Sequence, residues 1–175
     1  MNNDYLLLPA AEVQRRQSTL LLQWNPMFLR PSRADKPFSG FVAHFTDDIA
    51  WQLERVEAYD LVVVARAKAI EAEFRMVAVR GKDIVAASQY MQSGQFVIQR
   101  DVPSKAYEVA VAVVEMLGKD FPDPMYIVDI AHVAGKYYLL EINGFSCPVL
   151  YNCDLEAIVH AAHEEAMHEW KAMQL

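Results

Sequence analysis

Residues 125–143 read MYIVDIAHVAGKYYLLEIN, and the rest of the fold can be predicted outward from this stretch. Two apolar runs rich in β-forming residues, Tyr126–Asp129 and Tyr137–Ile142, flank a short connection at residues 134–136. Apolar runs on either side of a connection that contains glycine are typical of a β-hairpin. The sequence therefore predicts two antiparallel strands here.

Oxygen-bearing side chains gather on this predicted hairpin. Asp129 lies on its first strand, and Glu141 and Asn143 are two residues apart on the second, so they share one strand face. Carboxylate and amide oxygens are the ligands that Mg²⁺ prefers, especially when the ion also holds phosphate oxygens. The alternative is a strand-ending aspartate and a solvated glutamate. The apolar run before Glu141 and the Ile-Asn-Gly after it favour the metal site.

Composition limits the class of protein. The 175 residues are 54% hydrophobic and 22% charged, which predicts a packed core in one domain or in two small lobes. The net charge of −7 argues against a nucleic-acid backbone as the main partner. Cys147 and Cys153 are too few for a disulfide framework. No apolar run approaches membrane-spanning length and we expect no signal peptide, so the cytoplasm is the expected compartment.

The remaining segments predict separate helices and mostly antiparallel strands, which is an α+β fold. The second helix is expected to start at an N-cap, Thr46, and the third to be buried nearly all round. The last helix is expected to bury a stripe of Leu155, Ile158, Val159, Ala162, Ala166 and Trp170. Helices are expected at 10–23, 46–58, 104–117 and 155–173, and strands at 27–29, 41–45, 61–65, 73–79, 83–89 and 96–98.

Three further groups could carry chemistry. The loop at residues 32–40, with Arg30 before it, combines three cations, hydroxyls and glycine, which suits an anion but equally suits an exposed turn. Glu73 and Arg75 share a strand face, either as a surface salt bridge or with Arg75 turned towards phosphate. His160, His163 and Glu164 have a spacing that could bind zinc, although a solvated helix face is favoured.

Three segments together resemble an ATP-grasp domain, most closely the clade named for one arginine and two lysines and found in bacteria and phages. They are FLRPSRADKPFSGF (28–41), EFRMVAVRGKDIVAASQY (73–90) and YIVDIAHVAGKYYLLEIN (126–143). The resemblance implies two small α+β lobes that clamp ATP, with mostly antiparallel sheets. Residues 1–65 would form the smaller lobe, and residues 66–175 the lobe with the metal site.

The resemblance also implies roles for individual residues. Phosphate contacts fall on Arg30, Lys36 and Arg75, of which Lys36 and Arg75 would be catalytic, and Glu73 would orient one of these cations. Backbone groups near Val64 and Ala65 would bind adenine. The Mg²⁺ ligands would be Asp129, Glu141 and Asn143.

The implied activity is ATP- and Mg²⁺-dependent ligation. The γ-phosphoryl group of ATP would pass to the carboxylate of a small molecule or peptide, and an amine or thiol would then attack the acyl-phosphate. Only residues 1–27 precede the first matched strand, so the N-terminal domain usual in the family is expected to be missing and replaced by a homodimer or partner subunit. The alternatives are a shortened remnant that binds a protein partner without turnover, and a nucleotide sensor.

Overall fold

The computed structural model describes residues 4–33, 35–146 and 148–174. The chain divides after Lys68 into two compact units, here called the N-terminal unit and the C-terminal unit. Both units combine an antiparallel sheet with two helices, which confirms the predicted α+β class.

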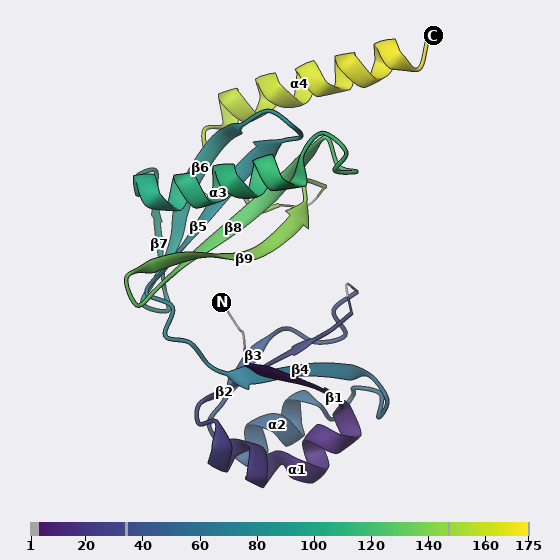
Figure 1. The fold of residues 1–175 in the computed structure, drawn as a ribbon, viewed down its shortest axis with the longest axis vertical. Helices are drawn as coiled ribbons and strands as arrows, with labels where there is room; N and C mark the ends of the chain where they lie inside the picture. The colour runs from purple at the N-terminus through teal and green to yellow at the C-terminus, as the bar shows by residue number, and fades with distance from the viewer. Residues whose placement is uncertain (1–3, 34, 147, 175) are drawn as a thin grey trace. The chain divides into compact units, whose positions relative to one another are not determined.

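The N-terminal unit is a four-stranded sheet with the order β1-β4-β2-β3. Its helices α1 and α2 pack together against one face of this sheet (Figure 1). The core between them includes Val13, Leu20, Leu29, Ile49 and Val64, all fully buried. The elements are β1 (Tyr5–Pro9), α1 (Ala10–Gln23), β2 (Met27–Pro31), β3 (Phe41–Ala43), α2 (Thr46–Gln52) and β4 (Leu61–Arg66).

Helix α2 differs from its prediction at both ends. Its N-cap is Phe45, and Thr46 is already helical. The Asp48 carboxylate accepts hydrogen bonds from the backbone N–H groups of His44 (2.8 Å) and Phe45 (3.0 Å), so an acid inside the first turn holds this end. The helix stops at Gln52 instead of near residue 58, because turns after Leu53 lead the chain to β4.

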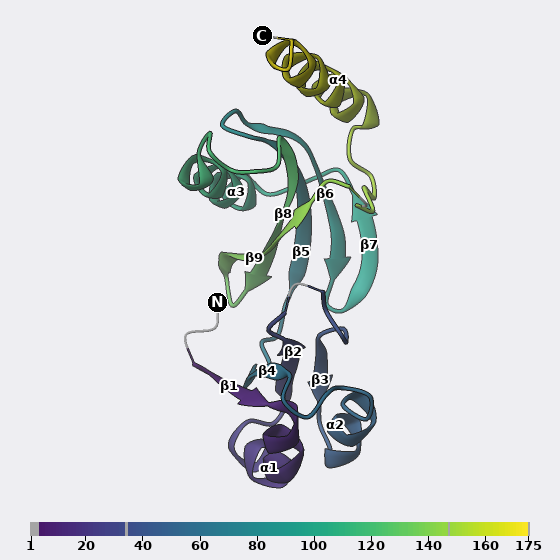
Figure 2. The same cartoon turned by 90° about the vertical axis from the view of Figure 1, so that its right-hand side faces the viewer.

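The C-terminal unit is a five-stranded antiparallel sheet with the order β7-β6-β5-β8-β9. Helix α3 covers one face of the sheet, and the start of α4 lies against the other (Figure 2). The elements are β5 (Ala72–Val79), β6 (Ile84–Gln92), β7 (Gln95–Gln99), α3 (Ser104–Leu117), β8 (Met125–Val133), β9 (Lys136–Gly144) and α4 (Leu155–Ala172).

Alternation along the strands separates two cores. On β5, Phe74 and Met76 pack on the α3 side, whereas Val77 and Val79 pack on the α4 side. The valines of α3 predicted a helix buried nearly all round, and this prediction was wrong. Only one face is buried, with Ala106, Ala110, Val113 and Val114, and Met116 is 74% exposed. A helix on the outside of a sheet needs only one apolar face.

The predicted hairpin is confirmed as β8 and β9. Ala134 and Gly135 form its two-residue turn, and both have positive φ angles, 49° and 74°. This is the conformation of the type I′ turn, whose twist matches that of the flanking strands. The strands are longer than their most apolar parts, and they pair from Tyr126–Gly144 to Val133–Lys136.

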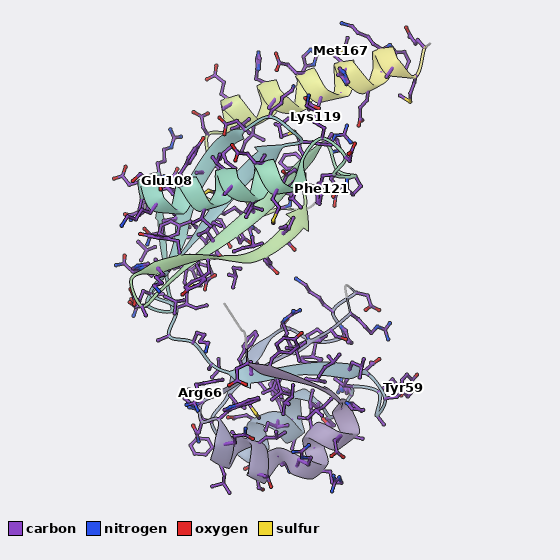
Figure 3. The ribbon with its side chains drawn as sticks, viewed as in Figure 1. Tyr59, Arg66, Glu108, Lys119, Phe121 and Met167 are labelled. Carbon is purple, nitrogen blue, oxygen red and sulfur yellow. The ribbon has the colours of Figure 1, made fainter. Side chains whose placement is uncertain are left out.

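Helix α4 packs against the sheet through its first half. Its buried residues are Ile158, Ala161 and Glu165, whereas Val159 and Trp170 of the predicted stripe are 67% and 57% exposed. Figure 3 shows Met167 on the half of the helix that extends past the sheet. Ile158 and Ala162 of the predicted stripe pack against the sheet, but its other members are exposed, because spacing assumes a core under the whole helix. Among residues 4–33, 35–146 and 148–174, none of the helices combines the length and the hydropathy that a membrane span requires.

Asp154 is the N-cap of α4. Its Oδ1 accepts hydrogen bonds from the N–H groups of Glu156 (3.1 Å) and Ala157 (3.2 Å). We expect Asp154→Ala to lower the free energy of unfolding by about 1 kcal/mol, because two helix-end donors lose their acceptor. Urea denaturation measures this change. His168→Ala, an exposed position on the same helix, serves as the control and should have little effect.

Candidate functional site

The strand register brings three of the predicted residues into one row. On β8, Asp129 lies opposite Arg75 of β5 on one side and opposite Glu141 of β9 on the other. Directly paired residues of neighbouring strands point to the same face of a sheet. Arg75, Asp129 and Glu141 therefore share the face opposite α3, and Asn143 follows Glu141 two residues further along β9.

A β-bulge in β9 makes this row possible. Asp129 pairs with Glu141, but the next residue, Ile130, pairs with Leu139, so Leu140 is an extra residue in β9. Leu139 and Ile142 both pack in the core on the α3 side. Strict alternation would place Glu141 on the same side as Leu139. The bulge moves Glu141 to the face that carries Asp129.

Arg75 holds Asp129 with a bidentate ion pair. The guanidinium Nε and Nη2 donate to Oδ1 (2.9 Å) and Oδ2 (2.7 Å) of Asp129, and Nη1 donates to the carbonyl of Val149 (2.9 Å). The side chains of Asp129 and Arg75 are only 1% and 13% exposed. The hydrogen bonds to Asp129 raise the pKa of Arg75 above its ordinary value. Arg75 is thus a permanent cation beside a buried carboxylate.

A cavity of about 340 Å³ opens beside this ion pair. Its volume is at the lower end of the range for small-molecule pockets. One cation, one carboxylate and one amide face it, a combination suited to phosphate oxygens together with a metal ion. The cavity is lined by Arg75, Ile127, Glu141, Asn143, Gly144, Ser146 and Pro148.

The donor set fits Mg²⁺ better than zinc. Asp129, Glu141 and Asn143 offer oxygen ligands only, which hard cations prefer. Within the described ranges, no group of three or more His, Cys, Asp or Glu side chains is placed to hold a metal ion. The predicted set of Asp129, Glu141 and Asn143 has only two residues of these kinds, because its third ligand is an amide. The zinc alternative at His160 and Glu164 gains no support, since these two form an ordinary i, i+4 pair at 3.9 Å.

Two tyrosines that the sequence analysis did not single out surround Arg75. The rings of Tyr90 and Tyr151 stack with centroids 4.7 Å apart, and Arg75 Cζ lies 5.5 and 5.2 Å from them. The Glu73 carboxylate accepts a hydrogen bond from the Tyr90 hydroxyl (2.5 Å). Tyr90 ends the second matched segment, which could have indicated it. No sequence signal indicates Tyr151, because it lies outside the three quoted segments, in the loop between β9 and α4.

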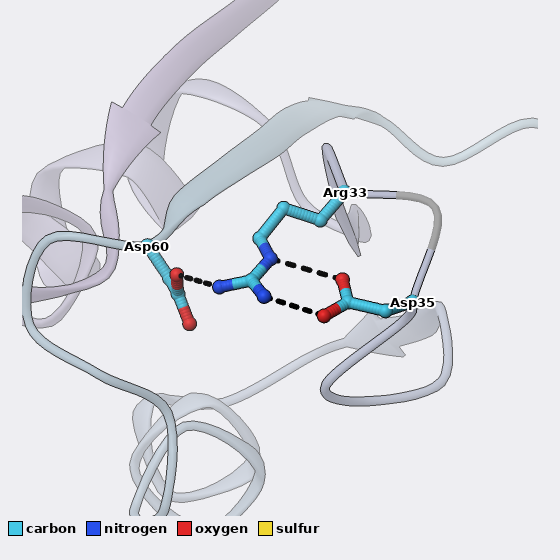
Figure 4. A network of polar contacts seen from close by, with 3 residues as sticks. All are labelled: Arg33, Asp35 and Asp60. Atoms are coloured by element: carbon cyan, nitrogen blue, oxygen red, sulfur yellow. Dashed lines mark hydrogen bonds and ion pairs between the residues drawn. The ribbon is translucent and has the colours of Figure 1, made fainter.

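The loop that follows β2 and carries Arg33 and Lys36 is held by an ion-pair network (Figure 4). Arg33 donates to both carboxylate oxygens of Asp35 (2.9 and 2.5 Å) and to Asp60 (3.0 Å). The hydrogen bonds from Arg33 lower the pKa of Asp35. Arg33 is one of the three cations of this loop, and two carboxylates hold its guanidinium.

Arg30 and Lys36 are the other two cations. Arg30 is exposed on β2, and its Nη1 donates to the carbonyl of Pro31 (3.3 Å). Lys36 is exposed in the loop and has a φ angle of 43°. Arg33 ties this loop to Asp60, directly before β4, and so positions the segment that carries Lys36.

Val64 and Ala65 lie within the N-terminal unit's core. Both side chains are fully buried, and their strand, β4, pairs with β1 on one side and with β2 on the other. The backbone groups of a central strand are used by its two neighbours. This arrangement lends no support to adenine binding by these two residues.

Cys153 is buried near the ion pair and is 3% exposed, whereas Cys147 lies outside the described residues. Burial raises the pKa of the Cys153 thiol to about 11. In a Cys147→Ser variant, we expect Cys153 to react with iodoacetamide at pH 8 about 100-fold more slowly in the native protein than in urea, because the thiolate is the reactive form. Mass spectrometry would follow the reaction. Equal rates would contradict burial of the thiol.

Solved structures with a similar fold include proteins named as ligases and synthetases. A D-alanyl-alanine synthetase A from Vibrio cholerae O1 biovar eltor str. N16961 matches with a TM-score of 0.60 at 18% identity, over 82% of this chain and 50% of that one. A D-alanine–D-alanine ligase from Bacillus anthracis matches with a TM-score of 0.59 at 16% identity, over 91% and 56%. The N5-carboxyaminoimidazole synthetase of Staphylococcus aureus matches with a TM-score of 0.54 at 12% identity, over 85% and 40%. This chain spans about half the length of the first two.

A search of curated proteins found no match. The model of a protein family matches residues 13–161, and it describes an ATP-grasp domain, family 2 of the clade named for one arginine and two lysines. The match includes all three segments quoted above and most of both units. The fold neighbours agree with it, and their identities of 12–18% support the fold alone. The chain belongs to this second family of the arginine-and-two-lysine clade of ATP-grasp domains.

Proposed function

We propose that this chain is an ATP- and Mg²⁺-dependent ligase that joins a carboxylate to an amine or thiol. The observation that carries the proposal is the row of Arg75, Asp129 and Glu141, with Asn143 beside it, around a cavity of about 340 Å³. Two carboxylates, an amide and a fixed guanidinium are the groups needed to hold a metal–triphosphate.

The residues of the row would have two different roles, metal binding and charge neutralisation. Asp129, Glu141 and Asn143 would hold Mg²⁺, which when bound offsets the charge of the phosphate oxygens. Arg75 would add a second, permanent positive charge where negative charge develops on the transferred phosphoryl group. Its ion pair with Asp129 and its hydrogen bond to Val149 fix that charge before any substrate arrives.

The reaction would take place in two displacements. A carboxylate oxygen of the substrate attacks the γ-phosphorus, the bond to the bridging oxygen breaks, and ADP leaves. An amine or thiol then attacks the acyl carbon of the acyl-phosphate, inorganic phosphate leaves, and the nucleophile loses a proton. The chain's own contribution is to orient the reactants and neutralise charge, and it forms no covalent bond to the substrate.

The comparisons support this proposal at the level of class. The similar folds include D-alanine–D-alanine ligases, and one from Bacillus anthracis was solved in complex with ATP. We propose a small-molecule or peptide carboxylate as the substrate. We also propose that a homodimer or a partner subunit supplies further substrate contacts. Use of ATP makes the cytoplasm the proposed compartment.

Arg30 and Lys36 remain predicted phosphate contacts, with Lys36 in a catalytic role. Both are exposed cations on or beside the matched segment at residues 28–41. Val64 and Ala65 stay predicted to lie near adenine. Glu73, which contacts Tyr90, stays predicted to orient one of the cations.

Titration calorimetry with ATP tests the proposal. We expect the wild-type chain to bind ATP in the presence of Mg²⁺ and to lose most of this affinity in EDTA. Glu141→Gln should abolish the effect of Mg²⁺, because it removes one ligand charge while keeping the side-chain shape. ADP release with panels of carboxylates and amines would then identify the substrates.

Glu108→Gln is the matched control. Glu108 is an exposed residue of α3 that lies on the other side of the sheet (Figure 3), so this change should leave ATP binding intact. Failure of the wild-type chain to bind ATP with Mg²⁺ would contradict the proposal. ATP binding without ADP release from any acceptor pair would favour the sensing alternative instead.

A further inference from the structure

The contacts around Arg75 go beyond what its ion pair with Asp129 requires. The two stacked rings of Tyr90 and Tyr151 are 4.7 Å apart and 5° from parallel, and each lies within 5.5 Å of the guanidinium carbon. Ring faces attract a guanidinium through their quadrupole at such distances. Arg75 is thus held by two independent kinds of contact.

Tyr151 adopts an unusual backbone conformation to reach this place. Its φ angle is 50°, in the left-handed region that bulky residues rarely occupy. Such strain persists only where surrounding contacts enforce it, and it concentrates at functional sites. Here the surrounding contacts are the Tyr90 ring, the guanidinium of Arg75 and the hydrogen bond from the Asn152 N–H to Ser88 Oγ (3.3 Å).

Tyr90 is fixed from the opposite end. It is 6% exposed, and its hydroxyl donates to Glu73 Oε2 at 2.5 Å. Burial of the ring, together with the nearby charge of Asp129, raises the pKa of Tyr90, so the phenol stays protonated and remains a donor. The ring therefore offers Arg75 a rigid surface whose position does not depend on Asp129.

We propose that Tyr90 and Tyr151 are positioning residues for Arg75. They keep the guanidinium beside the cavity when the oxygens of Asp129 are shared with a metal ion, so that Arg75 can contact phosphate without first being reordered. This inference rests on the proposed function for its role in nucleotide binding. The part that concerns the order of the guanidinium stands on the ring contacts alone.

Calorimetry with ATP and Mg²⁺ tests the nucleotide part. Tyr151→Phe keeps the ring and should leave the affinity within about twofold, whereas Tyr151→Leu should lower it about tenfold. Tyr151→Asn is a second ring-free variant, because asparagine accepts a left-handed backbone more readily than leucine does. It should lower the affinity to a similar extent.

NMR hydrogen exchange at Arg75 Nε–H tests the positioning part without nucleotide or metal. The measurement is made in an Asp129→Asn background, and Arg75→Lys assigns the signal. We expect exchange to be slow with tyrosine or phenylalanine at position 151 and at least about tenfold faster after Tyr151→Leu, since the ring contact is then lost.

The outcomes separate the inference from the proposed function. A wild-type chain that binds no ATP would overturn the proposed function, and the exchange rates would then decide the inference alone. If Tyr151→Leu and Tyr151→Asn changed neither the affinity nor the exchange rate, the inference would be overturned. It would also fail if Tyr151→Phe lost as much as Tyr151→Leu, because the hydroxyl and not the ring would then matter.

Discussion

Arg75→Met is expected to lower the free energy of unfolding by about 3–5 kcal/mol, the range measured when one partner of a buried ion pair is removed. The Asp129 side chain is 1% exposed and would lose its bidentate guanidinium. Methionine fills much of the volume of arginine, so the loss would reflect charge and hydrogen bonding. Urea denaturation at neutral pH measures the change.

The chain offers a control with the same chemistry at the surface. Arg15 also makes a bidentate contact, with Glu12 at 2.8 and 2.6 Å, but its side chain is 71% exposed. Arg15→Met should change stability little, since water replaces the lost contact. Similar losses for Arg15→Met and Arg75→Met would show that burial does not strengthen the Arg75–Asp129 pair.

Asp129→Asn is expected to weaken Mg²⁺-dependent ATP binding by more than about 100-fold. Changes to residues that merely support metal ligands cost about 10–100-fold in affinity, and Asp129 is a proposed ligand at the centre of the row. The amide keeps the shape of the carboxylate and one acceptor for Arg75, so folding should suffer less than binding. Calorimetry with and without Mg²⁺, beside urea denaturation, separates the two effects.

Asp123→Asn is the control for this loss. Asp123 is an exposed carboxylate of the same unit, and a Cβ built at Gly144 would lie 3.6 Å from its Oδ2. It is near the site but outside the row, so its neutralisation should leave Mg²⁺-dependent binding within about twofold. Comparable losses for both variants would mean that general negative charge, and not the Asp129 position, holds the metal.

Local pattern was sufficient for most elements. Helix α1 was predicted with its observed bounds, Ala10–Gln23, and α3 ends at Gly118, whose φ angle of 66° glycine adopts readily. The β8–β9 hairpin follows from a glycine turn between two apolar runs. These features depend on neighbours in sequence, which local propensity describes well. The α4 stripe was only partly correct because it depends on what lies beneath the helix.

The linear sequence was enough to establish the family, the antiparallel hairpin and the residue types of the proposed metal set, because these follow from motifs and from alternation along a strand. Which of these side chains meet was visible only in the folded chain. A bulge at Leu140 turns Glu141 towards Asp129, and strand pairing places Arg75 against Asp129, 54 residues away. A returning loop adds Tyr151. The physical reason is that ion pairs and ring contacts form between strands and loops distant in sequence, and a linear pattern does not encode their register.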